Sequence, residues 1–491
     1  MSVPFNNSYV QLPERFYSRQ SPTKVENPGL IRANPGLAKL LGIDPAWLSS
    51  DDGIETMAGN QIPKGADPIA TVYAGHQFGS WNPQLGDGRA ILLGEVIGTD
   101  GQRYDLQLKG SGQTPYSRMG DGRAPLGPVM REYIVSEAMA ALGVPTSRAL
   151  AAVTTGEPVY REEALPGAVL ARVAKSHIRI GTFQFFASKE DKEALGLLVN
   201  HVLERHYPNS VEEGASLNIK ALALLDEVMK AQAKLVGSWQ MIGFIHGVMN
   251  TDNVLLSGET VDYGPCAFMD TYNPETVFSS IDHGGRYAYR NQPSIAHWNM
   301  ACLAQALVLV IADKEENAIE IAKETLEKFP AYFQDANVSG MQHKLGLATR
   351  HDNDEMLAND FLGLLESHQL DFTLSFRRLS ELSGTLPAAN VSSLAGFPSA
   401  FDGWMARWKT RLDAEHNPTR QKDMLNTNPA IIPRNHLIEE SIVAASTEGN
   451  FDLFNELVDN LAFPFDLEGI DIRFAKKPKS EQVVRQTFCG T

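Results

Sequence analysis

Cysteine is scarce in this chain, and its scarcity excludes a fold built on disulfides. Only Cys266, Cys302 and Cys489 occur in 491 residues, which is neither a disulfide framework nor a zinc-ligand pattern. We therefore expect a reducing compartment, the cytoplasm. No basic segment followed by an apolar core stands near Met1, so a signal peptide is not expected.

Positive charge and long apolar runs are also in short supply. The 43 Lys and Arg face 59 Asp and Glu, a formal net charge of −16. Nucleic acids and anionic membranes are held by a large positive field, so neither partner is expected. The longest apolar stretch, around residues 301–312, contains Gln305 and is predicted to be too short to span a bilayer.

The order of secondary-structure signals predicts an α+β fold with two lobes. Residues 89–97 and Arg103–Lys109 have strand character, with a Gly-containing turn between them. Further strands are predicted over 149–153 and 168–173, and helices over 34–42, 128–142, 219–242, 311–329 and 451–461. This order predicts a β-rich N-lobe followed by a helical C-lobe, with a nucleotide site between them.

The same signals predict where the parts of the chain begin and end. We expect an N-terminal extension packed on the core over 1–60, the β-rich N-lobe over 61–185 and the helical C-lobe over 186–410. A C-terminal helical region with a flexible tail is expected over 411–491.

The segment His246–Asn253, followed by Asp262-Tyr263-Gly264, has the layout of a protein-kinase catalytic loop and its metal-binding motif. Val248 stands where a kinase has its catalytic Asp, and a valine cannot accept a proton. Asn253 and Asp262 offer hard oxygen ligands that suit Mg²⁺ or Mn²⁺. Asp252, the only carboxylate inside the loop, is the candidate base for a hydroxyl proton. The alternative for Asp252 is that it only caps a turn.

A predicted ion pair lies upstream of this loop. Lys109 ends a predicted strand and Glu132 lies on the next predicted helix. Kinases use such a Lys and Glu as a pair that holds the nucleotide phosphates. The alternative is a solvated Lys and an unrelated Glu.

Other candidates for phosphate binding are weaker when each is taken alone. The glycines of Gly86-Asp87-Gly88-Arg89 and Asp121-Gly122-Arg123 would let backbone N–H groups approach phosphates closely. Arg172 and Arg179 can converge on one phosphate chain. Taken alone, these patterns are better explained by ordinary turns and a solvated face.

Several longer stretches resemble the selenoprotein O family. They are Tyr73–Arg89 (YAGHQFGSWNPQLGDGR), Leu108–Arg118 (LKGSGQTPYSR), His246–Asn253, Asp262–Pro265 and Asn426–Pro429. The resemblance runs along nearly the whole chain. It implies a bilobal protein-kinase-like fold and a protein adenylyltransferase that moves AMP from ATP to Ser, Thr or Tyr hydroxyls of other proteins. Some bacterial members are described as using UTP with manganese, so UMP transfer is implied as a second activity.

The resemblance also implies a role for single residues. A nucleotide bound in the reverse direction to that of a kinase would turn its α-phosphate toward the hydroxyl, which makes sense of Val248. Asp252 would accept the proton, Asn253 and Asp262 would hold Mg²⁺ or Mn²⁺, and Glu132 would orient Lys109. The implied nucleotide contacts are Gly86, Gly88, Arg89, Lys109, Asp121, Gly122, Arg172, Arg179 and Asp262.

Two other functions stay open from the residues alone: an atypical kinase that transfers the γ-phosphate, and a nucleotide-binding pseudokinase. The C-terminus departs from the family pattern. Many eukaryotic members end in a Cys followed three residues later by selenocysteine, whereas this chain has Gln486 and Cys489. A local redox pair is therefore impossible, and a disulfide from Cys489 to Cys266 or Cys302 has no support in the sequence.

Overall fold

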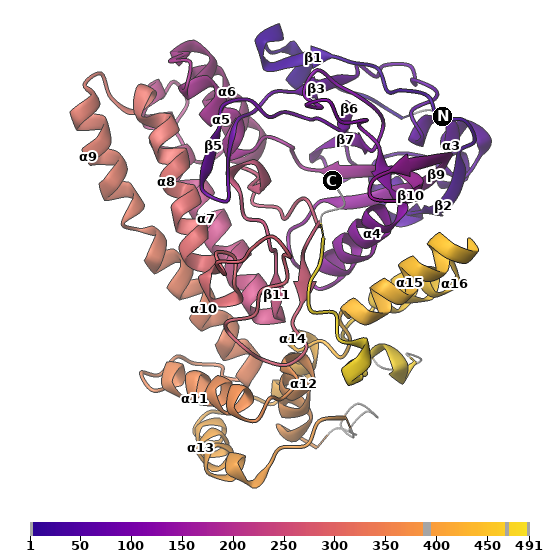
Figure 1. Cartoon of the computed structure of the whole chain (residues 1–491). Helices are drawn as coiled ribbons and strands as arrows, with labels where there is room; N and C mark the ends of the chain where they lie inside the picture. The colour runs from indigo at the N-terminus through magenta and orange to yellow at the C-terminus, as the bar shows by residue number, and fades with distance from the viewer. Residues whose placement is uncertain (1–2, 386–393, 467–470, 489–491) are drawn as a thin grey trace.

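The computed structural model describes residues 3–385, 394–466 and 471–488. An antiparallel sheet with strand order β1-β3-β6-β7-β10-β9-β2, and β8 beside β10, forms the N-terminal part (Figure 1). Its strands are β1 (Tyr17–Arg19), β2 (Gly29–Ala33), β3 (Ile69–Thr71), β6 (Ala90–Ile97), β7 (Arg103–Lys109), β8 (Ala124–Pro125), β9 (Arg148–Tyr160) and β10 (Ala164–Ala174). Two small two-stranded sheets stand apart, the hairpin of β4 (Gly75–Gln77) with β5 (Ser80–Asn82), and the pair of β11 (Phe244–Ile245) with β12 (Ala267–Phe268).

The hairpin of β6 and β7 confirms the predicted strand pair. Ala90 lies opposite Lys109 at one end, and Ile97 lies opposite Arg103 at the other. The turn closes with a hydrogen bond from the Gly98 N–H to the carbonyl of Gln102 at 2.8 Å. β9 and β10 are also confirmed, but both are longer than predicted, because the ends where they meet are partly exposed and contain Gly and Pro, which weaken the strand pattern.

Alternation along β7 separates a packing face from a polar face. Leu106 and Leu108 are fully buried and join a cluster with residues of α1 (Pro35–Leu40), α2 (Pro45–Leu48) and α3 (Asp51–Met57). Gln107 and Lys109 point the other way, as the period of a strand requires. There the helix α4 (Leu126–Ala141) packs against β9 and β10, so the polar face of β7 meets the helix that carries Glu132.

Helices make up the larger C-terminal part, drawn from magenta to yellow in Figure 1. The first group is α5 (Ile180–Ala187), α6 (Lys192–His206), α7 (Leu217–Ile242), α8 (Gln292–Ile311), α9 (Glu315–Leu326) and α10 (Phe329–Leu345). A second group, with its own hydrophobic core, is α11 (Asp354–Ser367), α12 (Phe372–Leu382), α13 (Asp402–Asp413) and α14 (Arg420–Thr427). The mixed architecture, a β-rich region followed by a helical one, is that expected of a kinase-like fold.

The long helix α7 delivers the chain to the candidate catalytic loop. It ends at Gly243, whose φ of +68° is a left-handed conformation that costs glycine little. The chain then forms β11 and reaches His246. The predicted buried helix over 219–242 is therefore confirmed.

The last two helices return to the sheet side of the molecule. α15 (Asn435–Glu448) and α16 (Asp452–Leu461) pack on α4, as their side-by-side placement in Figure 1 shows. The ring centroid of Phe454 lies 5.6 Å from that of Tyr133 on α4. The C-terminal helices thus support the helix that carries Glu132, a long-range contact that no local pattern indicates.

Among the described residues, one helix has the length and composition to cross a membrane. It runs over Tyr289–Ile311, 23 residues with a mean hydropathy of 1.6, and 56% of its apolar window is buried inside the protein. The apolar helical segment is therefore longer than the stretch of 301–312 that the sequence predicted, and the prediction that it is too short to span a bilayer was wrong on length. Its apolar side chains pack against α5, α7 and α9, which accounts for the composition.

The motif Asn426–Pro429 lies between helices of the second helical group. The Asn428 side-chain N–H donates to the carbonyl of Lys344 and to the hydroxyl of Ser380, each at 2.9 Å. Its own carbonyl accepts from Arg377 at 3.1 Å. These buried contacts tie α10, α12 and α14 together, so this motif stabilises the fold away from the candidate loop.

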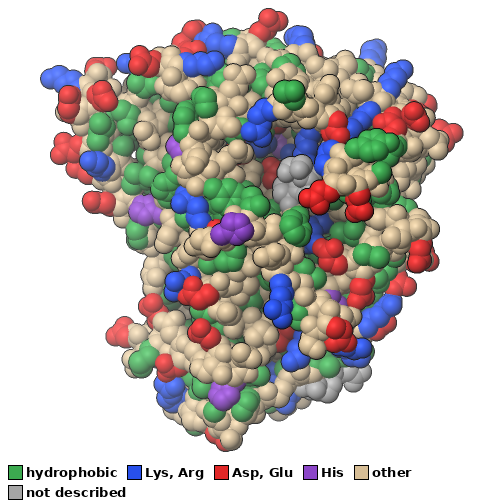
Figure 2. Space-filling view, viewed as in Figure 1, with side chains coloured by type: hydrophobic (Ala, Val, Ile, Leu, Met, Phe, Trp, Pro, Cys, Tyr) green, Lys and Arg blue, Asp and Glu red, His purple; other side chains and the backbone are tan. Residues whose placement is uncertain are grey.

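Acidic and basic side chains are intermixed over the face drawn in Figure 2. Cys266 and Cys302 are buried, whereas Cys489 lies outside the described residues. The predicted boundaries at residues 60, 185 and 410 remain a prediction, although β1 and β2 show that the first 60 residues contribute strands to the sheet.

Candidate active site

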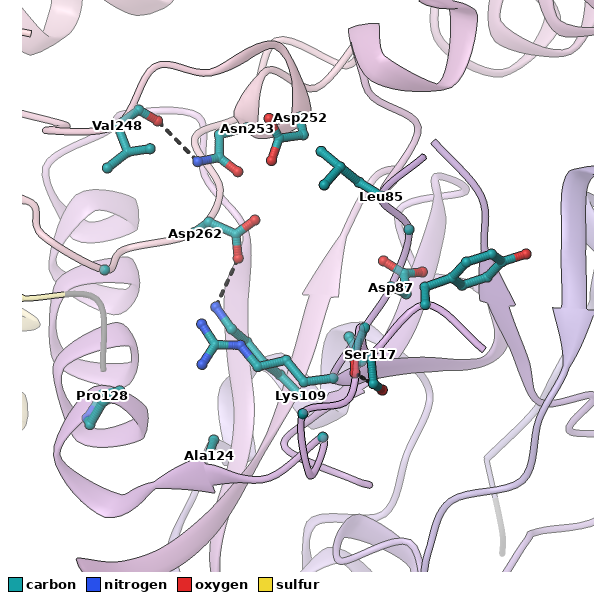
Figure 3. A pocket seen from close by; sticks show the side chains of 18 of the residues that line it. Leu85, Asp87, Lys109, Ser117, Ala124, Pro128, Val248, Asp252, Asn253 and Asp262 are labelled. Carbon is teal, nitrogen blue, oxygen red and sulfur yellow. Dashed lines mark hydrogen bonds and ion pairs between the residues drawn. The ribbon is translucent and has the colours of Figure 1, made fainter. Parts of the chain in front are cut away.

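A cavity of about 560 Å³ lies where the sheet, α4 and the loops after α7 meet. It is lined by all the residues that the sequence marks as candidates, and Figure 3 shows several of them facing it. They are Gly86, Gly88, Arg89, Lys109, Asp121, Gly122, Glu132, Arg172, Arg179, Asp252, Asn253 and Asp262. The fold thus brings together residues from β7, β10, α4 and four loops.

Four charged side chains form the centre of the site. The Lys109 Nζ lies 2.6 Å from Glu132 Oε2 and 2.8 Å from Asp262 Oδ1. The Arg172 Nη1 lies 3.0 Å from Glu132 Oε1 and 2.7 Å from the same Asp262 oxygen. The predicted Lys109–Glu132 pair is thus part of a larger network, in which both carboxylates contact Lys109 and Arg172.

These cations determine the ionisation of both carboxylates. Burial alone would raise the pKa of Asp262, but the charges of Lys109, Arg172 and Arg179 outweigh it and hold this pKa well below its usual value. Burial likewise opposes ionisation of Glu132, and Lys109 and Arg172 keep its pKa below the usual value too. Both groups are therefore anionic at neutral pH.

Asp262 adopts a backbone conformation that is uncommon for a residue with a side chain. Its φ is +63°, in the left-handed region that Asp tolerates better than most residues do. Its carbonyl accepts the N–H of Gly264 at 3.0 Å and closes a tight turn. This turn directs the carboxylate toward Lys109 (Figure 3).

The candidate loop is tied to the strand-like segment before Asp262 through His246. The His246 Nε2 donates to the carbonyl of Val261 at 2.9 Å, and its Nδ1 accepts the Val248 N–H at 3.3 Å. The Asn253 side-chain N–H donates to the Val248 carbonyl at 3.0 Å. Because that nitrogen is engaged, the amide oxygen of Asn253 is turned toward the side of Asp262 (Figure 3).

Asp252 is surrounded very differently from Asp262. It is 7% exposed, and Gln77 Nε2 donates to its Oδ2 at 3.2 Å. Its Oδ1 is buried without a hydrogen-bond partner among the described residues. Burial raises the pKa of this carboxyl to about 6, although the charge of Arg179 and the hydrogen bond from Gln77 oppose the rise. Such a group can hold and release a proton near neutral pH.

Arg179 links the two carboxylates. Its Nη1 donates to the backbone carbonyl of Asp252 at 2.8 Å and lies 3.6 Å from Asp262 Oδ2. Its guanidinium carbon lies 4.4 Å from the ring centroid of Tyr73, a cation–π contact that sequence reasoning did not assign.

The glycines at 86 and 88 make room for a neighbouring loop. A side chain at Gly86 would collide with the ring of Tyr116, and the φ of +119° there is itself suited to glycine. A Cβ at Gly88 would lie 2.8 Å from the Tyr116 carbonyl. The close packing of Tyr116 therefore explains both glycines, and it draws this loop to the wall of the cavity.

Asp121 and Gly122 lie at the rim, where sequence reasoning missed a partner. Arg161, at the turn between β9 and β10, lies 2.8 Å from Asp121 Oδ2 and 3.1 Å from its Oδ1. This hydrogen-bonded pair lowers the pKa of Asp121. A lone Arg beside acidic residues in a hairpin turn carries no signal that could have identified Arg161 in advance.

The oxygen ligands at the site fit a divalent cation that shares its coordination with phosphate and water. Over residues 3–385, 394–466 and 471–488, no group of three His, Cys, Asp or Glu side chains forms a cage for a metal ion. Mg²⁺ is commonly held by one or two carboxylates together with substrate phosphates and water. The carboxylate of Asp262 and the amide oxygen of Asn253 are donors of that kind.

A kinase-like two-part fold, a Lys–Glu pair on the sheet side and an Asn–Asp pair on the loop side define a nucleotide-dependent transferase. The chain belongs to the SelO family, whose description is Protein adenylyltransferase SelO and which it matches over residues 1–462. It is therefore an enzyme of the nucleotidyltransferase class.

Relatives with similar sequences extend along the whole chain. Protein nucleotidyltransferase YdiU of Rhodopseudomonas palustris is 55% identical over 490 residues, which cover 99% of each chain. The protein of the same name from Bradyrhizobium diazoefficiens is 54% identical with the same coverage. That of Nitrobacter winogradskyi is 52% identical, with 100% of this chain and 96% of the relative covered.

Proposed function

We propose that this protein transfers AMP from ATP to Ser, Thr or Tyr hydroxyls of other proteins and releases pyrophosphate. One observation carries the proposal: a buried carboxylate, Asp252, stands beside a cation-lined site for phosphates, while Val248 occupies the position of the kinase base. The base is thus displaced along the loop. A displaced base suits attack at a phosphate other than the γ-phosphate.

The reaction follows from the positions of these residues. The acceptor hydroxyl oxygen forms a bond to the α-phosphorus, and its proton passes to Asp252. The bond between the α-phosphorus and the bridging oxygen of the leaving group breaks, and pyrophosphate departs with that electron pair. Lys109, Arg172 and Arg179 bind phosphate oxygens and stabilise the charge that develops on them.

The remaining predicted residues bind and orient the nucleotide. We propose that Gly86, Gly88, Arg89, Asp121 and Gly122 contact it, and that Glu132 orients Lys109. Asn253 and Asp262 hold Mg²⁺ or Mn²⁺, which when bound neutralises phosphate charge and polarises the phosphorus–oxygen bond.

UMP transfer from UTP is a second candidate activity. The relatives carry the wider name nucleotidyltransferase, which does not specify the base of the nucleotide. A cytoplasmic location, where nucleoside triphosphates and acceptor proteins occur together, is part of the proposal and accords with the low cysteine content of the chain.

Transfer of label from ATP tests the proposal directly. With Mg²⁺ or Mn²⁺ and a mixture of acceptor proteins, label from α-phosphate-labelled ATP should appear on protein, and label from γ-phosphate-labelled ATP should not. The reverse result would establish a kinase, and binding of ATP without either label on protein would establish a pseudokinase. Mass spectrometry of the labelled acceptors would identify the modified residue and distinguish AMP from UMP.

A further inference from the structure

The small hairpin of β4 and β5 lies against the candidate catalytic loop and contacts it at consecutive positions. The His76 N–H donates to the Thr251 hydroxyl at 2.7 Å. The Phe78 N–H donates to the Asn250 side-chain oxygen at 2.9 Å. Two backbone groups of the hairpin are therefore fixed to two neighbouring side chains of the loop.

Close to these two anchors, the hairpin reaches both oxygens of Asp252. The Gln77 side-chain N–H donates to Oδ2 at 3.2 Å, and it is the only side-chain donor to this carboxylate within the described parts of the chain. Gly75 covers the other oxygen, because a Cβ at this position would lie 2.7 Å from Oδ1. The two contacts together restrict rotation of the carboxylate about its bond to Cβ.

The outer side of the hairpin is held by two helices of the C-terminal part. The Gln184 side chain of α5 contacts His76 Nδ1 at 2.9 Å. The His76 ring lies 4.9 Å from the ring of Trp81 and 5.5 Å from that of Trp298 on α8, measured between centroids. Supports of this kind on rigid elements are what keep a catalytic group within a narrow range of orientations.

We infer that Gln77 is a positioning residue: from the β4–β5 hairpin it holds the Asp252 carboxylate in the orientation that accepts the proton of the acceptor hydroxyl. This inference rests on the proposed function and adds a residue to it. Gln77 acts through Asp252, so its removal affects the rate of the bound complex and leaves nucleotide affinity intact.

Replacement of Gln77 by Met tests this role, since Met keeps the length and shape of the side chain and lacks the donor. With Gln77→Met we expect kcat for AMP transfer to fall about 10–100-fold, because displacement of a catalytic group by about 1 Å costs a factor of this order. The KM for ATP should change by less than about threefold. Gln84→Met is the matched control, an exposed Gln on the segment after the hairpin, and it should retain the wild-type kcat.

A rise in the KM for ATP with unchanged kcat would overturn the inference, because it would make Gln77 a nucleotide contact. Unchanged kcat and KM would overturn it as well. Gly75→Ala provides an independent perturbation: it displaces Asp252 and leaves Gln77 in place, and it should lower kcat in the same way.

A double-mutant cycle separates positioning from general support of the fold. If Gln77 acts through Asp252, Gln77→Met should change the residual rate of Asp252→Ala by less than about twofold. Equal losses in both backgrounds would contradict the inference. Absence of α-phosphate label with the wild-type protein would contradict the proposed function itself, whereas loss of label with Asp252→Ala but not with Gln77→Met would contradict only the role of Gln77.

Discussion

Asp252 and Asp262 lie in one loop region between α7 and α8, yet their surroundings differ. Asp262 contacts Lys109 at 2.8 Å and Arg172 at 2.7 Å, and its pKa is held well below the usual value. Asp252 has a neutral neighbour in Gln77, and burial raises its pKa to about 6. Two carboxylates of the same type thus differ in the free energy of binding a proton.

This difference in pKa indicates different chemical roles for the two carboxylates. A carboxylate that stays ionised can bind a metal ion and hold the Lys and Arg side chains that contact phosphates. A carboxylate with a raised pKa is suited to proton transfer. The two environments therefore support the roles proposed for Asp252 and Asp262, which residue type alone does not distinguish.

The largest effect is expected when the charge of Asp262 is removed. Asn tolerates a left-handed φ as Asp does, so Asp262→Asn isolates the charge from the turn. We expect AMP transfer to fall by at least about 10³-fold and the affinity for the metal–nucleotide complex to fall with it. Transfer of α-phosphate label and a nucleotide-binding titration would measure the two effects.

Asp270→Asn provides the control for this substitution. Asp270 is a carboxylate of the same segment that forms an ion pair with Arg434 outside the cavity. This variant should keep the rate of transfer within about threefold. Wild-type nucleotide affinity in Asp262→Asn would show that the charge contributes nothing to binding.

A smaller and more selective effect is expected at Asp252. Asp252→Asn should lower kcat about 10²–10³-fold, the usual contribution of a general base. The dissociation constant for ATP should stay within about threefold of the wild-type value, in contrast to Asp262→Asn. A wild-type kcat would refute the base assignment, and a loss of nucleotide affinity would make the two carboxylates equivalent.

The smallest effect concerns stability, and it has opposite signs at the two positions. For Asp252 the pKa in the folded protein, about 6, exceeds the ordinary 3.8. The free energy of unfolding therefore falls as pH rises from about 4 to 6, and above pH 6 the buried, ionised carboxylate continues to destabilise the folded state. Asp252→Asn should raise the free energy of unfolding by about 1–3 kcal/mol at pH 7.5 and not at pH 4.

For Asp262 the folded pKa is depressed, so its carboxylate stabilises the fold above the ordinary pKa and that stability is lost only as pH falls well below it. Asp262→Asn should therefore destabilise the protein at pH 7.5. Thermal unfolding at the two pH values, without metal or nucleotide, would measure both variants. If both substitutions changed the free energy of unfolding at pH 7.5 in the same direction, the proposed difference between the surroundings of Asp252 and Asp262 would be contradicted.

Local patterns were sufficient for much of the sheet and of the central ion pair. The β6–β7 hairpin follows from an apolar run before a Gly-containing turn and an alternating pattern after it, and α7 follows from a long apolar helix pattern. Lys109 and Glu132 were predicted as a pair because each lies on a recognisable element. Arg172 joined the site from the next strand, and its position opposite Gln107 follows from the pairing of β10 with β7.

Contacts between distant segments could not be predicted in the same way. Gln77 reaches Asp252 across 175 positions of sequence, and Arg161 reaches Asp121 from another hairpin. α15 and α16 pack on α4 only after the whole helical part has formed. Neither the hydrophobic period nor the residue type predicts such contacts, because these contacts depend on how complete helices and strands pack together.

By itself the sequence determined the chemistry available to this protein: the side-chain oxygens of Asn253 and Asp262, the carboxylate of Asp252, and Val248 in the position of the kinase base. The tertiary structure decided how those groups differ. Burial beside a neutral hairpin makes Asp252 a weak acid, and contact with three cations keeps Asp262 ionised. Both effects depend on distance and on exclusion of water, which exist only in the folded protein.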